Sequence, residues 1–239
     1  MDAYLENRCK VFDENYKRVL ERFHEAALKS GRQPSEITLL AATKTVEPAV
    51  INHAYRQGIR VMGENRVQEF LSKEEHLEPG LRLQFIGTLQ TNKVRQIVGK
   101  VELIQSVDSL KLAHEIARQS LMRSIVTDVL VEINIGNEEA KSGIDAAALP
   151  AFLEQLAEIS GIRVRGLMTL GPLHLSNDKK LQVFEKMQKL FIDNKAKKVD
   201  NIFMDILSMG MSGDFDIAIL AGSNMVRVGT ALFGARQYQ

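Results

Sequence analysis

The chain has 239 residues, 45% of them hydrophobic, and its 31 basic and 30 acidic side chains leave a formal net charge of +1. This length suits one barrel or two small domains, and the balanced charge gives no electrostatic basis for binding nucleic acid or an anionic membrane. No apolar run approaches the roughly 18 residues of a membrane span, the N-terminus lacks signal-peptide features and Cys9 is the only cysteine, so we expect a cytoplasmic protein without a membrane segment.

Residues 1–30 have the apolar spacing of a long helix, which Ser30, Gly31 and Pro34 end. After this helix, eight short apolar segments rich in β-branched residues alternate with helical patterns, and each segment predicts a strand. The predicted strands cover residues 37–42, 59–62, 83–86, 103–105, 129–135, 164–168, 203–207 and 225–228. The helical patterns between them cover residues 48–56, 67–71, 94–98, 110–121, 149–159, 177–195 and 215–220.

Eight strands that alternate with helices are what a (β/α)8 barrel requires, and this length is near the lower limit of that fold. We therefore predict an α/β fold, a (β/α)8 TIM barrel with an extra N-terminal helix. No linker, repeat or low-complexity tract divides the sequence, so we expect a single domain over residues 1–239, with the barrel over 37–234. A doubly wound open sheet is the alternative, although the glycine-rich pattern that such sheets use for dinucleotides is absent.

Lys44 follows the first predicted strand directly. A buried, unpaired ammonium is costly and has a lowered pKa, and the neutral lysine amine is the nucleophile of Schiff-base chemistry. Most lysines are exposed, however, so a side chain that reaches the solvent is the simpler interpretation. Lys44 is therefore a candidate that needs support from the rest of the site.

Ser212 follows the seventh predicted strand, and Gly229 and Thr230 end the eighth. Loops after strands seven and eight of this barrel commonly bind phosphate through free backbone N–H groups. The alternative is that the glycines only form turns. No spacing of histidine, cysteine or carboxylate side chains indicates a metal site.

A phosphate site opposite a strand-end lysine indicates pyridoxal 5'-phosphate (PLP), with the aldehyde on Lys44. Arg227 would then lie at the ring, where a permanent cation keeps the pyridine nitrogen unprotonated and weakens the cofactor as an electron sink. The alternative role of Arg227 is a salt bridge at the barrel mouth with Asp214 or Glu64.

Several short motifs lie at the ends of the predicted strands and in the following loops. In chain order they are Ala42-Thr43-Lys44-Thr45, Gly63-Glu64-Asn65, Phe85-Ile86-Gly87, Leu89-Gln90-Thr91-Asn92-Lys93, Lys141-Ser142-Gly143, Arg165-Gly166-Leu167-Met168, Leu207-Ser208-Met209-Gly210-Met211-Ser212 and Val226-Arg227-Val228-Gly229-Thr230. In this order, and over nearly the whole chain, they resemble the pyridoxal phosphate homeostasis protein family. That family is similar to the barrel domain of bacterial alanine racemase without its second domain.

The resemblance implies that Lys44 carries PLP as an internal aldimine and that Arg227 faces the pyridine nitrogen. It further implies phosphate ligands and two pocket-wall residues. The implied phosphate ligands are Ser212, Gly229 and Thr230, and the implied wall residues are Asn65 and Met168. Gln84 departs from the family pattern, since many members have a histidine just before the Phe-Ile-Gly motif.

The function that the resemblance implies is PLP (vitamin B6) homeostasis inside the cell by a non-catalytic carrier. PLP-dependent apoenzymes are its expected partners, and a monomer is the expected state because the missing second domain removes one dimer interface.

The alternative is a PLP-dependent amino-acid racemase, which needs an acid/base on each face of the bound α-carbon. Lys44 would serve one face. The racemase takes its second acid/base, a tyrosine, from the domain that this family lacks, and no tyrosine of this sequence lies at a predicted strand end. The tyrosines are Tyr4, Tyr16, Tyr55 and Tyr238. A third possibility is a class I aldolase that uses Lys44 without a cofactor, but this function gives Arg227 no evident role. The carrier is therefore the favoured interpretation, and no catalytic residue is assigned.

Overall fold

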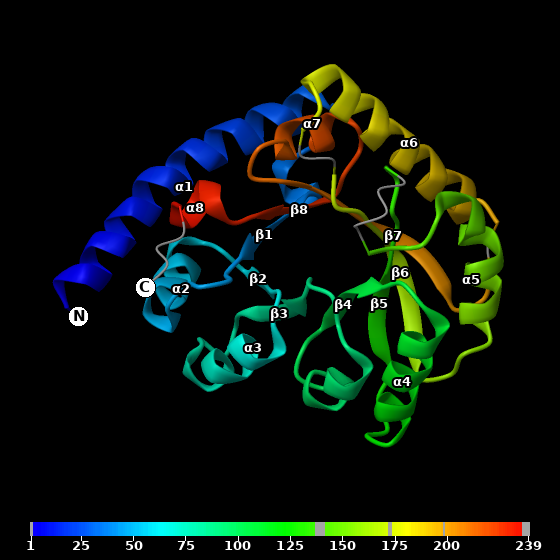
Figure 1. The fold of residues 1–239 in the computed structure, drawn as a ribbon. Helices are drawn as coiled ribbons and strands as arrows, with labels where there is room; N and C mark the ends of the chain where they lie inside the picture. The colour runs from blue at the N-terminus through cyan, green and yellow to red at the C-terminus, as the bar shows by residue number, and fades with distance from the viewer. Residues whose placement is uncertain (1, 137–141, 172–173, 198, 236–239) are drawn as a thin grey trace.

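The computed structural model describes residues 2–136, 142–171, 174–197 and 199–235. Eight parallel strands close into a barrel in chain order, with the last strand paired to the first (Figure 1). They are β1 (Thr38–Ala42), β2 (Val61–Glu64), β3 (Arg82–Phe85), β4 (Leu103–Val107), β5 (Thr127–Glu132), β6 (Ile162–Met168), β7 (Ile202–Met211) and β8 (Met225–Val228). The predicted (β/α)8 barrel is confirmed, and the open sheet is excluded.

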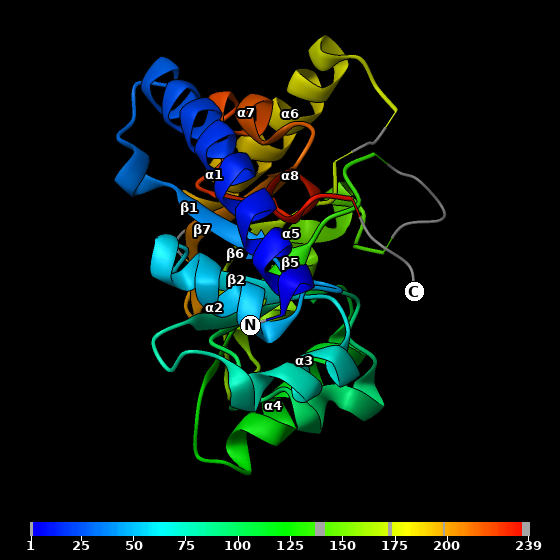
Figure 2. The same ribbon diagram turned by 90° about the vertical axis from the view of Figure 1, so that its left-hand side faces the viewer.

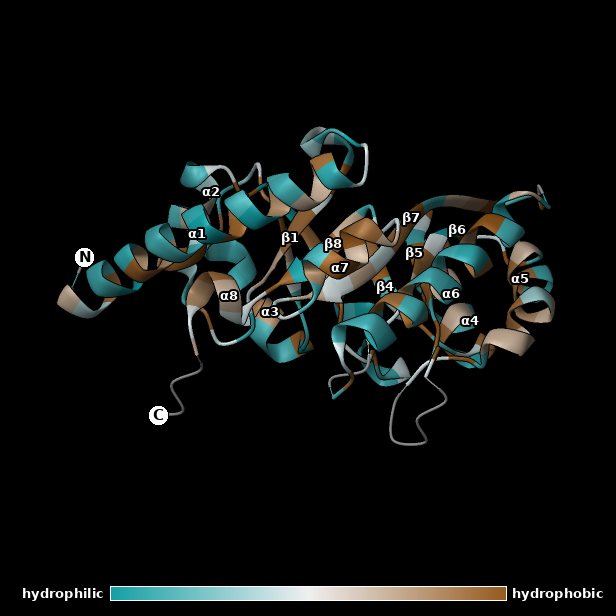
Figure 3. Ribbon diagram, turned by 90° about the horizontal axis from the view of Figure 1, so that it is seen from above, coloured by the Kyte–Doolittle hydropathy of each residue, from teal (hydrophilic) through white to brown (hydrophobic). Residues whose placement is uncertain are grey.

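Helices surround the barrel, with their polar faces outward and the apolar strands inside (Figure 3). They are α1 (Ala3–Lys29), α2 (Pro48–Gln57), α3 (Val67–Lys73), α4 (Leu110–Leu121), α5 (Leu149–Ala157), α6 (Asn177–Lys195), α7 (Phe215–Leu220) and α8 (Thr230–Phe233). In the part of the chain that the structure describes, none of them has an apolar stretch long enough to cross a membrane.

The extra helix α1 lies across the outside of the barrel, over α2, α7 and α8 (Figure 2). Phe12, Val19 and Phe23 are buried on its inner face, as their helical spacing predicts. Arg8 and Asn15 donate hydrogen bonds to the last carbonyls of α8, at 2.9 Å to Phe233 O and 3.1 Å to Leu232 O. The first helix thus braces the seam where β8 meets β1.

Several elements differ from the predicted ones by one or two residues, β2 among them (61–64 for 59–62), and the larger differences are as follows. β7 continues to Met211 because Gly210, at φ +93°, lets the strand bend instead of stopping. β5 ends at Glu132, and Ile133 forms only an isolated bridge. The predicted helix 94–98 is a 3-10 segment, η3 (Thr91–Gln96), and Gly99 at φ +85° lies in the turn that follows it. Helix α8 after Gly229 was not predicted.

The inside of the barrel is part apolar and part polar. Its apolar cluster consists of Leu40, Val61, Ile86, Leu103, Leu130, Met168 and Met225. Buried polar side chains fill other positions and come from β3, β4, β7 and β8: Gln84, Gln105, Ser208 and Arg227. Interiors of such barrels are dominated by bulky branched apolar residues, so these four buried polar side chains are unusual and must be paired with one another or with a ligand.

Candidate functional site

The turn that carries Lys44 is held in a strained conformation. Lys44 lies two residues after β1 and is half-buried. Thr45, the next residue, has φ +61°, which a β-branched residue rarely adopts. The backbone N–H of Thr45 donates to the carboxylate of Glu69, on α3. Strain of this kind persists only where surrounding contacts enforce it, and it gathers at functional sites.

Below this turn, Lys73 on α3 forms a buried ionic cluster. Its Nζ donates to Thr43 O at 2.9 Å, to Glu64 Oε1 at 2.8 Å and to Glu69 Oε1 at 2.7 Å, which uses all three ammonium protons. Burial raises the pKa of Glu64, while the charge and hydrogen bonds of Lys73 and the hydroxyl of Thr43 act against this rise. The cluster ties the Lys44 turn to β2 and α3.

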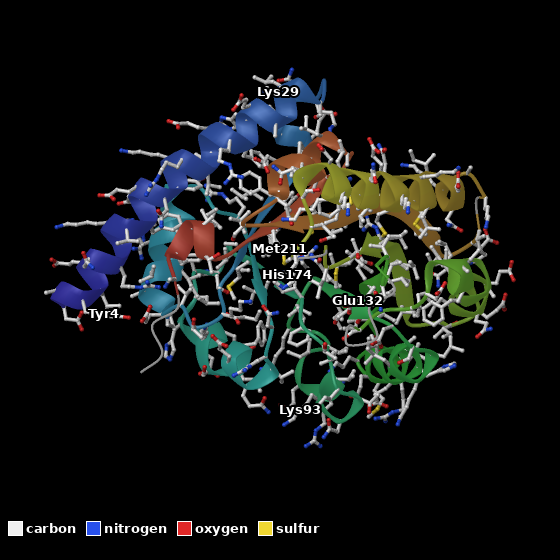
Figure 4. The ribbon with its side chains drawn as sticks, turned by 45° about the horizontal axis from the view of Figure 1, so that its top comes forward. Tyr4, Lys29, Lys93, Glu132, His174 and Met211 are labelled. Carbon is white, nitrogen blue, oxygen red and sulfur yellow. The ribbon has the colours of Figure 1, made fainter. Side chains whose placement is uncertain are left out.

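Lys44 lines a cavity of about 190 Å³ together with Gly229 and Thr230. The pairing of β1 with β8 brings these residues together from opposite ends of the chain. The remaining lining residues are Tyr4, Arg8, Ala42, Thr45, Val46, Glu47, Phe233, Gly234 and Ala235. Tyr4, labelled at the start of α1 in Figure 4, therefore lies at the same cavity as Lys44, although sequence reasoning set every tyrosine aside.

Backbone N–H groups converge on the hydroxyl of Ser212. Its Oγ accepts from Gly229 N at 3.1 Å and from Ala231 N at 3.2 Å. A Cβ added to Gly229 would lie 3.2 Å from Ala42 O, a tight contact that glycine avoids. Two N–H donors that converge on one oxygen can also bind a phosphate oxygen, and the Ser212 hydroxyl, which accepts both here, keeps its own proton to donate. The residues present therefore fit a phosphate group.

Arg227 is buried, with 3% of its surface exposed. Its Nη1 donates to Ser208 Oγ at 2.6 Å and its Nη2 to Thr169 O at 2.7 Å. Burial lowers the pKa of Arg227 to about 10, against the opposing effect of Glu132 and Asp214, so the guanidinium stays charged at neutral pH.

Within the described residues Arg227 makes no ion pair, so neither suggested salt bridge exists. Glu64 binds Lys73 at 2.8 Å, and Asp214 faces Lys180 at 3.4 Å.

Glu132 is a candidate that sequence reasoning missed. It ends β5, is 3% exposed and is labelled in Figure 4. Burial raises the pKa of Glu132 to about 7, aided by Asp108 and opposed by Arg227. The rule that functional residues lie at strand ends would have found it, but the predicted strand ran three residues too far and hid the carboxylate inside it.

Asn65 and Met168 lie at the ends of β2 and β6. The Oδ1 atom of Asn65 is buried without a hydrogen-bond partner in the described part of the chain, so it can accept from a ligand. Met168 is fully buried in the apolar cluster of the barrel interior.

The cavity around Lys44 does not bring all the predicted site residues together. Asn65, Met168, Ser212 and Arg227 are not among its lining residues. Lys141 and Tyr238 lie outside the described residues. Among those described, no group of three or more histidine, cysteine or carboxylate side chains is placed to bind a metal.

Comparison with known proteins gives a consistent result. The family model "Alanine racemase, N-terminal domain" matches residues 20–237. A "Pyridoxal phosphate homeostasis protein" of Aquifex aeolicus is 44% identical over 227 residues, which cover 94% of this chain and 98% of the relative.

Two solved structures are similar over most of their length. A crystal structure of an unknown protein from Bifidobacterium adolescentis has a TM-score of 0.90 at 35% identity and covers 98% of this chain and 97% of its own. PipY of Synechococcus elongatus, solved with PLP bound, has a TM-score of 0.78 at 32% identity and covers 89% and 100%.

Proposed function

The chain belongs to the pyridoxal phosphate homeostasis protein family, and from this membership we propose that it binds PLP and acts in PLP homeostasis. The family indicated by the sequence motifs is thereby confirmed. The observation that carries the proposal is the PLP bound in the structure of PipY, which is 32% identical to this chain.

Lys44 is proposed as the attachment point of the cofactor. Its amine adds to the aldehyde carbon of PLP and one water leaves, which gives an aldimine. Support comes from the strained turn, which presents Lys44 at a cavity shared with Gly229 and Thr230.

The phosphate is proposed to bind at Ser212, Gly229 and Thr230, where the N–H groups of Gly229 and Ala231 converge. Arg227 is assigned to the pyridine nitrogen, since its guanidinium is fixed and charged. Asn65 and Met168 are assigned to the wall of the site. We place all of these in one domain, residues 1–239.

The protein is proposed to hold the cofactor without turnover, as a monomer that supplies PLP-dependent apoenzymes. Tyr4 reaches the cavity, but its hydroxyl donates to Glu47 Oε1 at 2.9 Å, and this bond raises the pKa of Tyr4. The hydroxyl therefore remains protonated at neutral pH and is directed at Glu47. Tyr16 and Tyr55 pack in the outer apolar cluster of α1 and α2.

One observation favours the racemase alternative. Glu132 is a buried carboxyl with a pKa of about 7, which suits a general acid/base at neutral pH. Turnover has to be measured to decide between the two functions.

The cofactor assignment is tested by adding PLP to the purified protein and recording its absorption. Wild type gives the visible absorption of an aldimine, and Lys44→Ala does not. Lys93→Ala, which changes a lysine of η3, keeps the absorption and is the matched control. An unchanged spectrum of Lys44→Ala would reject Lys44 as the attachment point.

The carrier assignment is tested with L-alanine and other L-amino acids in deuterated water. We expect no exchange of the α-proton beyond one equivalent per protein. Repeated exchange with formation of the D-amino acid, lost in both Lys44→Ala and Glu132→Gln, would establish the racemase instead.

A further inference from the structure

A chain of hydrogen bonds runs through the inside of the barrel. Arg227 Nη1 donates to Ser208 Oγ at 2.6 Å, and Ser208 Oγ donates to Gln105 Oε1 at 2.7 Å. Gln105 Nε2 then donates to Gln84 Oε1 at 2.6 Å, and Gln84 Nε2 donates to Glu102 Oε1 at 2.6 Å. Gln105, from β4, thereby reaches across the barrel to β7.

The direction of every bond in this chain is fixed from both ends. Arg227 can only donate, so Ser208 accepts from it and has its single hydroxyl proton for Gln105. An ionised Glu102 can only accept, so the amide of Gln84 must turn its NH₂ group toward it. All donors point from the cation to the carboxylate, an alignment in which neighbouring hydrogen bonds strengthen one another.

The chain connects the two mouths of the barrel. Gln84, Gln105 and Ser208 are at most 2% exposed, whereas 38% of the Glu102 side chain is exposed. Glu102 lies at the amino ends of the strands, in a cavity of about 360 Å³ that also contains Arg82, at 3.5 Å from it. Burying two glutamines inside a barrel is unfavourable unless each polar group is paired, and here the chain pairs them.

We propose that Gln105 and Gln84 are positioning residues of the cofactor site. They fix the guanidinium of Arg227 through Ser208, and they transmit the charge of Glu102 from the opposite mouth of the barrel. The link to the cofactor rests on the proposed contact of Arg227 with the PLP ring. The link between Glu102 and Arg227 does not depend on it.

The link between Glu102 and Arg227 is tested in the cofactor-free protein by NMR of the arginine side-chain N–H groups. The Arg227 resonances are assigned by their loss in Arg227→Lys. Glu102→Gln, a surface change that keeps an acceptor but removes the charge, shifts them. Asp205→Asn removes a charge at the same mouth from an exposed carboxylate that pairs with Arg165 and takes no part in these hydrogen bonds, and it shifts them less. Equal shifts in both variants, or none, would overturn the proposal.

The link to the cofactor is tested with Gln105→Leu, which has a similar volume and breaks the chain at its centre. PLP affinity falls on the order of tenfold, because Ser208 loses its acceptor and Arg227 its support, and the absorption maximum of bound PLP shifts. Gln119→Leu changes another buried glutamine (5% exposed), which lies on α4 and takes no part in this series of hydrogen bonds. It leaves the PLP affinity and the absorption maximum unchanged.

The outcomes separate the two proposals. If wild type binds PLP through Lys44 while Gln105→Leu matches it in affinity and spectrum, this inference is wrong and the proposed function stands. If wild type fails to bind PLP, the proposed function is wrong, and the NMR comparison still decides whether Glu102 acts on Arg227.

Discussion

The hydroxyl oxygen of Ser212 accepts a hydrogen bond from the backbone N–H of Gly229 at 3.1 Å, across 17 positions of sequence. The end of β8 therefore supplies the N–H donors, and the loop after β7 supplies the oxygen that holds them together. A ligand oxygen that replaces Ser212 Oγ as their acceptor meets donors that already point to one position, so ordering them costs little.

Ser212→Ala is expected to weaken PLP binding about 30-fold, because a hydrogen bond to a charged phosphate contributes about 2 kcal/mol. Titration of the protein with PLP, followed by absorption, measures the effect. Inorganic phosphate should also compete less well for the variant. Ser72→Ala, at an exposed serine of α3, is the control. Equal affinities of Ser212→Ala and wild type would remove Ser212 from the phosphate site.

Glu132 predicts a specific dependence of stability on pH. The folded-state pKa of about 7 lies above the ordinary 4.5, so the folded protein holds this proton more tightly than the unfolded chain does. The associated stability is complete below pH ~4.5 and is lost as the pH rises through ~7. Between pH 5 and 8, wild type should therefore lose on the order of 3 kcal/mol more than Glu132→Gln.

Urea unfolding at the two pH values measures this difference. Glu154→Gln, at an exposed carboxyl of α5, should differ from wild type by the same amount at both. If Glu132→Gln also differs from wild type equally at pH 5 and 8, Glu132 does not hold the proton.

Lys73→Met should destabilise the protein by roughly 3–5 kcal/mol, because it leaves the carboxylate of Glu64 buried without its cation. Adding Glu64→Gln should recover part of this loss, since the double variant no longer buries a charge. Lys189→Met breaks a surface pair with Asp193 and should cost at most ~0.5 kcal/mol. Chemical denaturation of the four proteins measures these values. A Lys73→Met variant as stable as Lys189→Met would contradict the buried cluster.

Gly166→Ala should destabilise the barrel by on the order of 3 kcal/mol. Gly166 has φ +148°, and a Cβ built there would lie 1.9 Å from Ile206 O, in the backbone of β7. Gly213 has no atom within 4 Å of such a Cβ, so Gly213→Ala should stay within ~0.5 kcal/mol of wild type. Thermal unfolding compares the two, and similar melting temperatures would show that β6 and β7 can move apart at no cost.

The sequence was sufficient to predict the barrel because its strands are buried on both faces and its helices have one apolar face. These patterns are local, and helix α4 was predicted to the residue. The end of β5 was placed wrongly because apolar residues continue past Glu132, where pairing with β6 stops. The end of β5 thus depends on its pairing with β6 in the closed barrel and not on its local sequence.

Gln84 shows why part of the site could not be predicted. In the sequence it is a polar residue in a short strand and differs from the family pattern without an evident reason. Its role depends on Gln105, Ser208 and Arg227, from three other strands, which meet it only in three dimensions. Tyr4 is a similar case, because α1 reaches the cavity only after packing against α8.

The pairing of β1 with β8 also constrains when the site can form. During synthesis Lys44 leaves the ribosome long before Gly229 exists, so a nascent chain carries the lysine proposed to bind PLP without the N–H groups proposed to bind its phosphate. Any ligand held by both ends of the chain favours the closed barrel by mass action. Cofactor loading should thus report that a molecule has been synthesised to its last strand and has closed correctly.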